Sequence, residues 1–194
     1  MMLASAVQIF IVCFYGIAFC YGQTCDLSKF TEDQIVPHII PKTPDEALKV
    51  SYAGVEVECG TELPRDRADP QPQIEYTAIN HEFYTLVMID PDAPDPDTPN
   101  FRHFLHWFVV NIPGSAVSQG KVLTQYMMPS PPAYSRAHRY IFLVYKQPIY
   151  IFSPSYMDGK RRSKFDLEKM VQELELVGPL SGNYFFTKHE RSKK

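Results

Sequence analysis

Two apolar segments that flank a proline-rich turn constrain this fold more than any other part of the sequence. Residues 83–89 are apolar at nearly every position, which predicts a strand that is buried on both faces. Four prolines follow between positions 91 and 99, and each fixes its own φ and pushes the preceding residue toward extended geometry. We therefore expect the sheet to stop at a stiff turn and to resume as a second buried strand over residues 101–112.

Polar side chains occur where these two strands meet the turn. Asp90 ends the first strand, and the second strand carries a histidine, His106. Alternation along that strand predicts one face made of Arg102, Phe104, His106 and Phe108. Trp107 would then lie on the opposite face, in the core. An acid at a strand end, a rigid turn and a histidine on the next strand are typical of a pocket wall.

A third long strand is predicted over residues 136–147, after a second rigid rim formed by Pro131 and Pro132. Alternation predicts that one face of this strand carries His138, Tyr140, Phe142 and Val144. Shorter strands are expected before and after these segments, including residues 48–52, 55–59 and 183–187. The sequence therefore predicts a mainly β domain with a sandwich architecture.

One longer helix is predicted near the C-terminus. Asp166 is a good N-cap, and a single apolar stripe follows at Leu167, Met170, Val171 and Leu174. Gly178-Pro179 would end the helix. We expect this helix to lie at the periphery of the β domain.

The N-terminus resembles a secretory signal. Residues 1–24 contain no charged side chain, and residues 7–20 form its apolar centre. We expect cleavage after Gly22, which gives a signal peptide (1–22), one domain (23–187) and a charged tail (188–194). An uncleaved membrane anchor is the alternative. The formal net charge of −3 argues against a nucleic-acid partner.

The cysteine pattern agrees with export. Cys13 and Cys20 would leave with the signal, and Cys25 and Cys59 would remain in an oxidising compartment. A disulfide between Cys25 and Cys59 is the economical interpretation, and two unpaired thiols are the alternative.

Two separated motifs occur in an order and spacing that resemble the phosphatidylethanolamine-binding protein family. The motifs are Asp90-Pro91-Asp92-Ala93-Pro94 with His106 after it, and Pro131-Pro132 followed by His138-Arg139-Tyr140. The similarity extends from about Val50 to Phe186. The resemblance implies a sandwich of two antiparallel sheets with a small anion-binding cavity at one end.

The resemblance also implies which residues line that cavity. The expected ligand-binding set is Asp90, His106, His138 and Tyr140, with Pro94, Phe104, Pro131 and Pro132 around it. Asp92 and Arg139 fall at the alternate positions of their segments, and we expect them to form a structural ion pair or a loop clamp and not to bind the ligand. We also expect a cis peptide bond, with Ala93–Pro94 as its most favoured position.

The chemistry of the four polar residues suits a phosphate. The two imidazoles and the phenol can donate hydrogen bonds, and Asp90 can pair with a protonated histidine or meet the ammonium group of a head group. The sequence therefore predicts a secreted, non-enzymatic binder of a small phosphorylated ligand such as a phospholipid head group, without cofactor, metal or membrane insertion after cleavage. The alternative is a protease inhibitor or a module that binds a signalling partner.

Three other interpretations are weaker. The four polar residues could form a buried network whose hydrogen bonds are all made within the network, and such a network would need no ligand. A metal site would use two histidines and a carboxylate, but no local His-x-x-x-His spacing supports it. A hydrolase would use Ser135 as nucleophile and His138 as base, but no Gly-x-Ser-x-Gly motif surrounds Ser135.

Tyr134-Ser135-Arg136 replaces the family's glycine-rich turn, so the cavity lip is either narrower or carries Arg136 as an additional cation.

Overall fold

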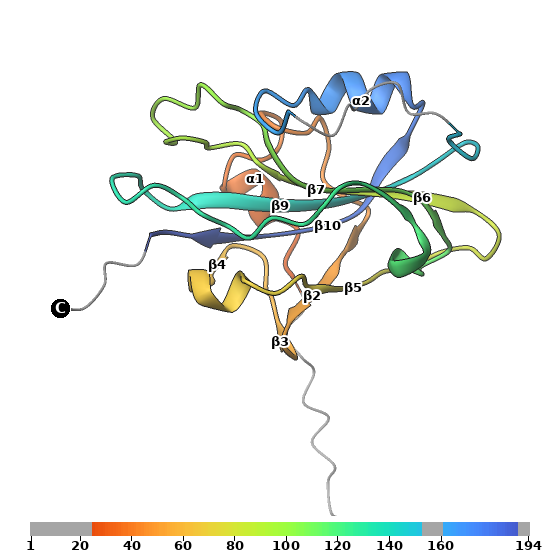
Figure 1. Cartoon of the computed structure of the whole chain (residues 1–194), viewed down its shortest axis with the longest axis horizontal. Helices are drawn as coiled ribbons and strands as arrows, with labels where there is room; N and C mark the ends of the chain where they lie inside the picture. The colour runs from red at the N-terminus through yellow and green to blue at the C-terminus, as the bar shows by residue number, and fades with distance from the viewer. Residues whose placement is uncertain (1–24, 153–160, 190–194) are drawn as a thin grey trace, which may run out of the picture.

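A computed structural model describes residues 25–152 and 161–189. The predicted signal peptide and residues 190–194 of the predicted tail lie outside this range. Within it, two sheets and two short α-helices form the fold (Figure 1).

The larger sheet has seven strands, and its four long strands lie next to one another at the centre. In spatial order its strands are β1 (Glu46–Ala47), β10 (Val177–Thr187), β9 (His138–Lys146), β6 (Phe83–Asp90), β7 (Phe104–Pro113) and β8 (Lys121–Thr124), and β4 (Thr61–Glu62) also pairs with β10. The central pairs are antiparallel, whereas β1 and β4 pair with β10 in parallel. The smaller antiparallel sheet contains β3 (Val55–Glu56), β2 (Lys49–Tyr52) and β5 (Gln73–Glu75). The predicted mainly β, two-sheet fold is confirmed.

The helices lie outside the sheets. They are α1 (Lys29–Glu32), α2 (Leu167–Glu173) and the 3-10 turns η1 (Arg65–Ala68) and η2 (Val117–Gln119). Asp166 caps α2 as predicted, because its carboxylate accepts from the Lys169 N–H at 3.0 Å. The helix ends before the predicted stop, and Gly178-Pro179 lies inside β10. None of the described helices is long and apolar enough to cross a bilayer.

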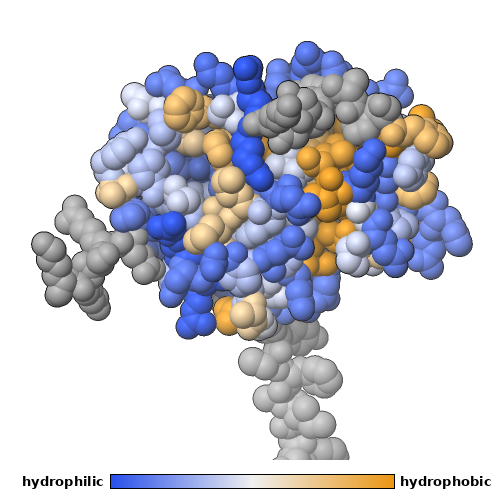
Figure 2. Space-filling model, viewed as in Figure 1, coloured by the Kyte–Doolittle hydropathy of each residue, from blue (hydrophilic) through white to orange (hydrophobic). Residues whose placement is uncertain are grey.

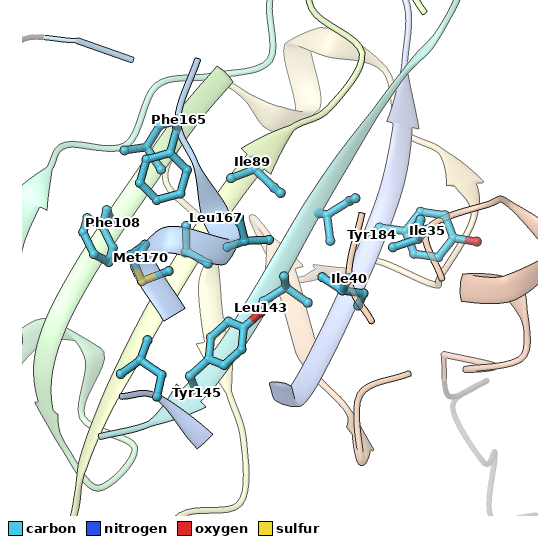
Figure 3. Packing of buried hydrophobic residues seen from close by; sticks show 14 of the residues in the cluster. Ile35, Ile40, Ile89, Phe108, Leu143, Tyr145, Phe165, Leu167, Met170 and Tyr184 are labelled. Carbon is cyan, nitrogen blue, oxygen red and sulfur yellow. The ribbon is translucent and has the colours of Figure 1, made fainter. Parts of the chain in front are cut away.

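Two apolar clusters hold the layers together, one on each face of the larger sheet. The first lies between the sheets and contains Tyr52 of β2, Trp107 of β7 and Phe142 of β9. The second packs the opposite face against α2 and the N-terminal segment. Figure 3 shows Leu167 and Met170 of α2 over this face, with Ile40 and Tyr184 in the same cluster. Burial on both faces explains why the central strands have nearly continuous apolar sequences.

A β-bulge in β7 changes the predicted orientation of its side chains. Ile89 pairs with Leu105, but Met88 pairs with Trp107, so His106 is an extra residue in the ladder. Trp107 therefore joins the cluster between the sheets, and Phe108 lies on the opposite face. The predictions that Phe108 shares a face with His106 and that Trp107 opposes it were wrong, because strict alternation fails across a bulge.

A disulfide joins Cys25 to Cys59 and fixes the N-terminal segment beside β10. The Lys29 ammonium group donates to the Cys59 carbonyl at 3.0 Å. Phe30 and Ile35 of this segment are fully buried in the cluster under α2. The N-terminal segment is therefore part of the core of the domain.

Candidate functional site

A cavity of about 230 Å³ lies where β6 ends and β9 begins. These strands are antiparallel, so Asp90 at the end of β6 comes close to His138 at the start of β9. Seven of the eight predicted ligand-binding residues line this cavity: Asp90, Pro94, Phe104, His106, Pro132, His138 and Tyr140. Pro131 is buried and is not part of the lining. The bond between Ala93 and Pro94 is cis, as predicted.

A continuous hydrogen-bond chain runs through Asp90. One carboxylate oxygen accepts from the Asp92 N–H at 2.7 Å, and the other lies 2.8 Å from His138 Nδ1. His138 Nε2 lies 2.7 Å from the Ser135 hydroxyl. The carboxylate can only accept, so the His138 Nδ1–H donates to it, and Nε2 accepts from Ser135. Both Asp90 and His138 are buried, which makes this chain rigid.

His106 faces the same cavity from the bulge of β7. Its Nδ1 lies 2.7 Å from the Met127 carbonyl, so the Nδ1–H donates and Nε2 keeps a free lone pair. Burial lowers the pKa of His106, although the Met127 carbonyl and the Asp90 carboxylate act in the opposite direction. The imidazole is therefore neutral at neutral pH and becomes a second donor only after it takes up a proton.

Tyr140 supplies a phenol next to both histidines. Its ring contacts His106 edge-on, with 5.1 Å between ring centroids, and stacks on His138 at 6.4 Å. Burial and the nearby Asp90 charge raise the pKa of Tyr140 well above its ordinary value. The phenol thus remains protonated and can donate a hydrogen bond into the cavity.

Asp92 and Arg139 lie beside the cavity and form an ion pair. Asp92 accepts from the Arg139 backbone N–H and Nε, both at 2.9 Å, and from Nη2 at 2.5 Å. Arg139 also donates to the Asp33 carbonyl at 2.9 Å. This pair connects the proline turn, β9 and the N-terminal segment, so it fixes the positions of Asp90 and His138.

The sequence did not reveal how the His106 bulge is supported. Arg162 donates to the carbonyls of Leu105 and His106, both at 3.0 Å, and to the Gln125 carbonyl at 2.8 Å. No local pattern in the sequence around Arg162 shows that its side chain returns to β7. Arg136 pairs with Asp97 at the surface and does not line the cavity, so of the two alternatives for the cavity lip the additional cation finds no support.

Metal ligation finds no support in the part of the chain that the structure describes. Across residues 25–152 and 161–189, no three His, Cys, Asp or Glu side chains come together as a group that could hold a metal ion. The cavity instead offers imidazoles, a phenol and a carboxylate that is already engaged by His138.

Comparisons with known proteins agree with this architecture. A family model described as phosphatidylethanolamine-binding protein matches residues 53–185. The "Putative odorant-binding protein A5" of Drosophila melanogaster is 35% identical over 79% of this chain and 76% of its own length. The "26 kDa secreted antigen" of Toxocara canis is 33% identical over 83% of this chain and 63% of its own length. A solved structure, carboxypeptidase Y inhibitor complexed with the cognate proteinase, has a TM-score of 0.73 and 26% identity, and the match covers 84% of this chain and 95% of the inhibitor.

Proposed function

The chain belongs to the phosphatidylethanolamine-binding protein family, and from this premise we propose that it is a secreted binder of a small phosphorylated or otherwise anionic ligand. A phospholipid head group is one candidate. The observation that carries the proposal is the convergence of Asp90, His106, His138 and Tyr140 on one cavity.

The size of the cavity supports a small ligand. Pockets for drug-sized molecules have volumes of about 300–1,000 Å³, whereas this cavity has about 230 Å³. A phosphate or a phosphorylated head group suits this volume, with any acyl chains outside. Pro94 and Pro132 border the cavity and restrict its backbone, which lowers the entropic cost of ordering the site around a ligand.

The hydrogen bonds of Asp90 favour binding of the anionic end of such a ligand inside the cavity. Asp90 already accepts from the Asp92 N–H and pairs with His138, so its charge is shared with protein donors. Tyr140 and a protonated His106 are then available to donate to phosphate oxygens. An ammonium group of a zwitterionic ligand would remain near the mouth.

Export from the cell is supported by three independent features. The uncharged apolar leader has the composition of a signal peptide, and the Cys25–Cys59 disulfide suits an oxidising compartment. A relative is named as a secreted antigen. These features support secretion as part of the proposal.

Protease inhibition is the second candidate function. It is favoured by the similarity to carboxypeptidase Y inhibitor, which was solved in a complex with its proteinase. We expect carboxypeptidase Y to lose activity in the presence of this protein. Full activity at a tenfold molar excess of the protein would contradict it.

Titration calorimetry tests the anion-binding proposal directly. Inorganic phosphate and phosphorylethanolamine are expected to bind, and ethanolamine is not. His106→Ala should weaken binding by about tenfold or more, since a hydrogen bond to a charged group contributes about 1.5–3 kcal/mol. Asp90→Ala should also weaken binding, because His138 loses the carboxylate that orients its ring. His38→Ala is the matched control, because His38 is exposed and lies outside the cavity. Variants of the cavity that bind phosphate as tightly as the wild type would show that the ligand binds elsewhere.

The lowered pKa of His106 predicts that anion binding depends on pH. Because His106 is neutral at neutral pH, an anion binds more tightly once the imidazole has taken up a proton. Sulfate affinity should rise as the pH falls from 8 to 5, by up to about tenfold per pH unit for one linked proton. Sulfate keeps its charge over this range, so the slope reports on the protein. The slope should disappear in His106→Ala, and an unchanged slope in that variant would assign the proton to another group.

A further inference from the structure

We propose that Ser135 is the nucleophile of an ester-cleaving site at the edge of the anion cavity. The proposal goes beyond ligand binding, and it depends on a chain of three side chains. Ser135 Oγ lies 2.7 Å from His138 Nε2, and His138 Nδ1 lies 2.8 Å from the Asp90 carboxylate. This is the order of nucleophile, base and acid in serine hydrolases, which are recognised by geometry and not by sequence position.

The surroundings of the chain favour activation of the hydroxyl. The side chains of His138 and Asp90 are only 1% and 4% exposed, so water does not compete for their hydrogen bond. Ser135 itself is partly exposed and can be reached by a substrate. Its N–H donates to the Pro132 carbonyl at 3.0 Å, which fixes the turn that presents the hydroxyl to His138.

A donor for the developing oxyanion is available on the same strand. Tyr140 follows His138 by two residues on β9, shares its face and lines the same cavity. The Ser130 backbone donates a hydrogen bond to the Tyr140 hydroxyl oxygen, which leaves the hydroxyl proton as the donor. A phenol is one of the side chains that can stabilise an oxyanion.

The reaction is an acyl transfer to Ser135 followed by transfer to water. Ser135 Oγ attacks the ester carbonyl carbon, its proton moves to His138 Nε2, and the carbonyl oxygen becomes an anion that the Tyr140 phenol would stabilise. Collapse breaks the bond to the alcohol, which leaves with the proton from His138. Water then repeats the sequence at the acyl-enzyme and releases the acid. Asp90 acts as a positioning residue that orients His138 and stabilises the imidazolium.

The cavity restricts the substrate to small esters. Its volume of about 230 Å³ accommodates a short acyl or alkyl group, and Phe104, Met127 and Pro132 supply apolar walls. Long acyl chains would extend beyond the cavity into solvent.

A fluorophosphonate probe tests the nucleophile without knowledge of the natural ester. Attack by Ser135 forms an O–P bond and releases fluoride, and the proton passes through His138 to solvent. We expect one adduct per molecule, located on Ser135 by peptide mass spectrometry. The adduct should be absent in Ser135→Ala, and Tyr140→Phe should slow labelling by about 100-fold, the effect of removing one oxyanion donor.

Ser118→Ala is the matched control, because Ser118 is an exposed serine in η2, away from the cavity. It should label at the wild-type rate, and thermal melting should show that all variants are folded. Absence of an adduct on wild-type Ser135, at probe concentrations that label a serine protease completely, would overturn the proposal. Inorganic phosphate, added as a competitor for the cavity, should slow the labelling of Ser135. Labelling at the same rate with and without phosphate would establish the nucleophile and would count against the anion-binding proposal.

Discussion

Asp92→Asn is expected to destabilise the protein by about 3–5 kcal/mol, as is typical when one partner of a buried ion pair is removed. The side chain of Asp92 is 2% exposed and that of Arg139 is 14% exposed. The asparagine would leave the largely buried Arg139 guanidinium charge beside a neutral amide. Urea unfolding of the two proteins at pH 7 measures this difference.

The pH dependence of the same variant gives an independent check. Burial alone would raise the pKa of Asp92, but the hydrogen bonds and charge of Arg139 lower it below the ordinary value. A carboxyl whose pKa is lowered in the folded state contributes stability above its unfolded pKa of about 3.9 and loses it as the pH falls through the folded value. The difference between the wild type and Asp92→Asn should therefore shrink in acid below about pH 4.

Asp97→Asn is the matched control for this prediction. Asp97 also pairs with an arginine, Arg136, but the two side chains are 72% and 67% exposed. Exposed ion pairs contribute about 0–1 kcal/mol, so Asp97→Asn should be nearly neutral. Equal effects of the two substitutions would mean that the Asp92–Arg139 pair does not hold the proline turn against β9.

Sequence patterns predicted the parts of the fold that depend on local burial. The strands β6, β7 and β9 have continuous apolar sequences because both of their faces are covered, and such runs are visible without coordinates. The parallel pairing of β1 and β4 with β10 was not predicted, since each contributes only two residues. Pairings between short, distant segments leave no periodic pattern in the sequence.

The cavity illustrates the same limit at the level of single residues. The resemblance to the phosphatidylethanolamine-binding protein family was needed to predict that Asp90, His138 and Tyr140 line one cavity, whereas alternation alone placed only His138 and Tyr140 on a common face. The orientation of His106 depends on a bulge that Arg162 supports from a distant segment, and no residue near His106 indicates that contact. The Ser135–His138 hydrogen bond depends on the shape of a turn whose sequence matches no hydrolase motif.

Removal of the Cys25–Cys59 disulfide is expected to lower the stability by about 3–4 kcal/mol and the Tm by about 10 °C. The two cysteines are separated by 34 positions, and a cross-link over a loop of this length restricts the unfolded chain by that amount in the loop-entropy model. Cys25→Ala/Cys59→Ala removes the link without leaving reactive thiols. Thermal unfolding of the variant and the wild type, with and without reductant, measures the effect.

The position of the disulfide explains why its loss should affect the core. The four residues of α1 are too few to form a stable helix alone, so the segment depends on packing and on the link to Cys59. Its release would uncover the cluster that contains Phe30, Ile35 and Tyr184. Reductant should lower the Tm of the wild type to that of the variant and leave the variant unchanged. A wild-type Tm that does not respond to full reduction would show that packing alone holds the N-terminal segment in place.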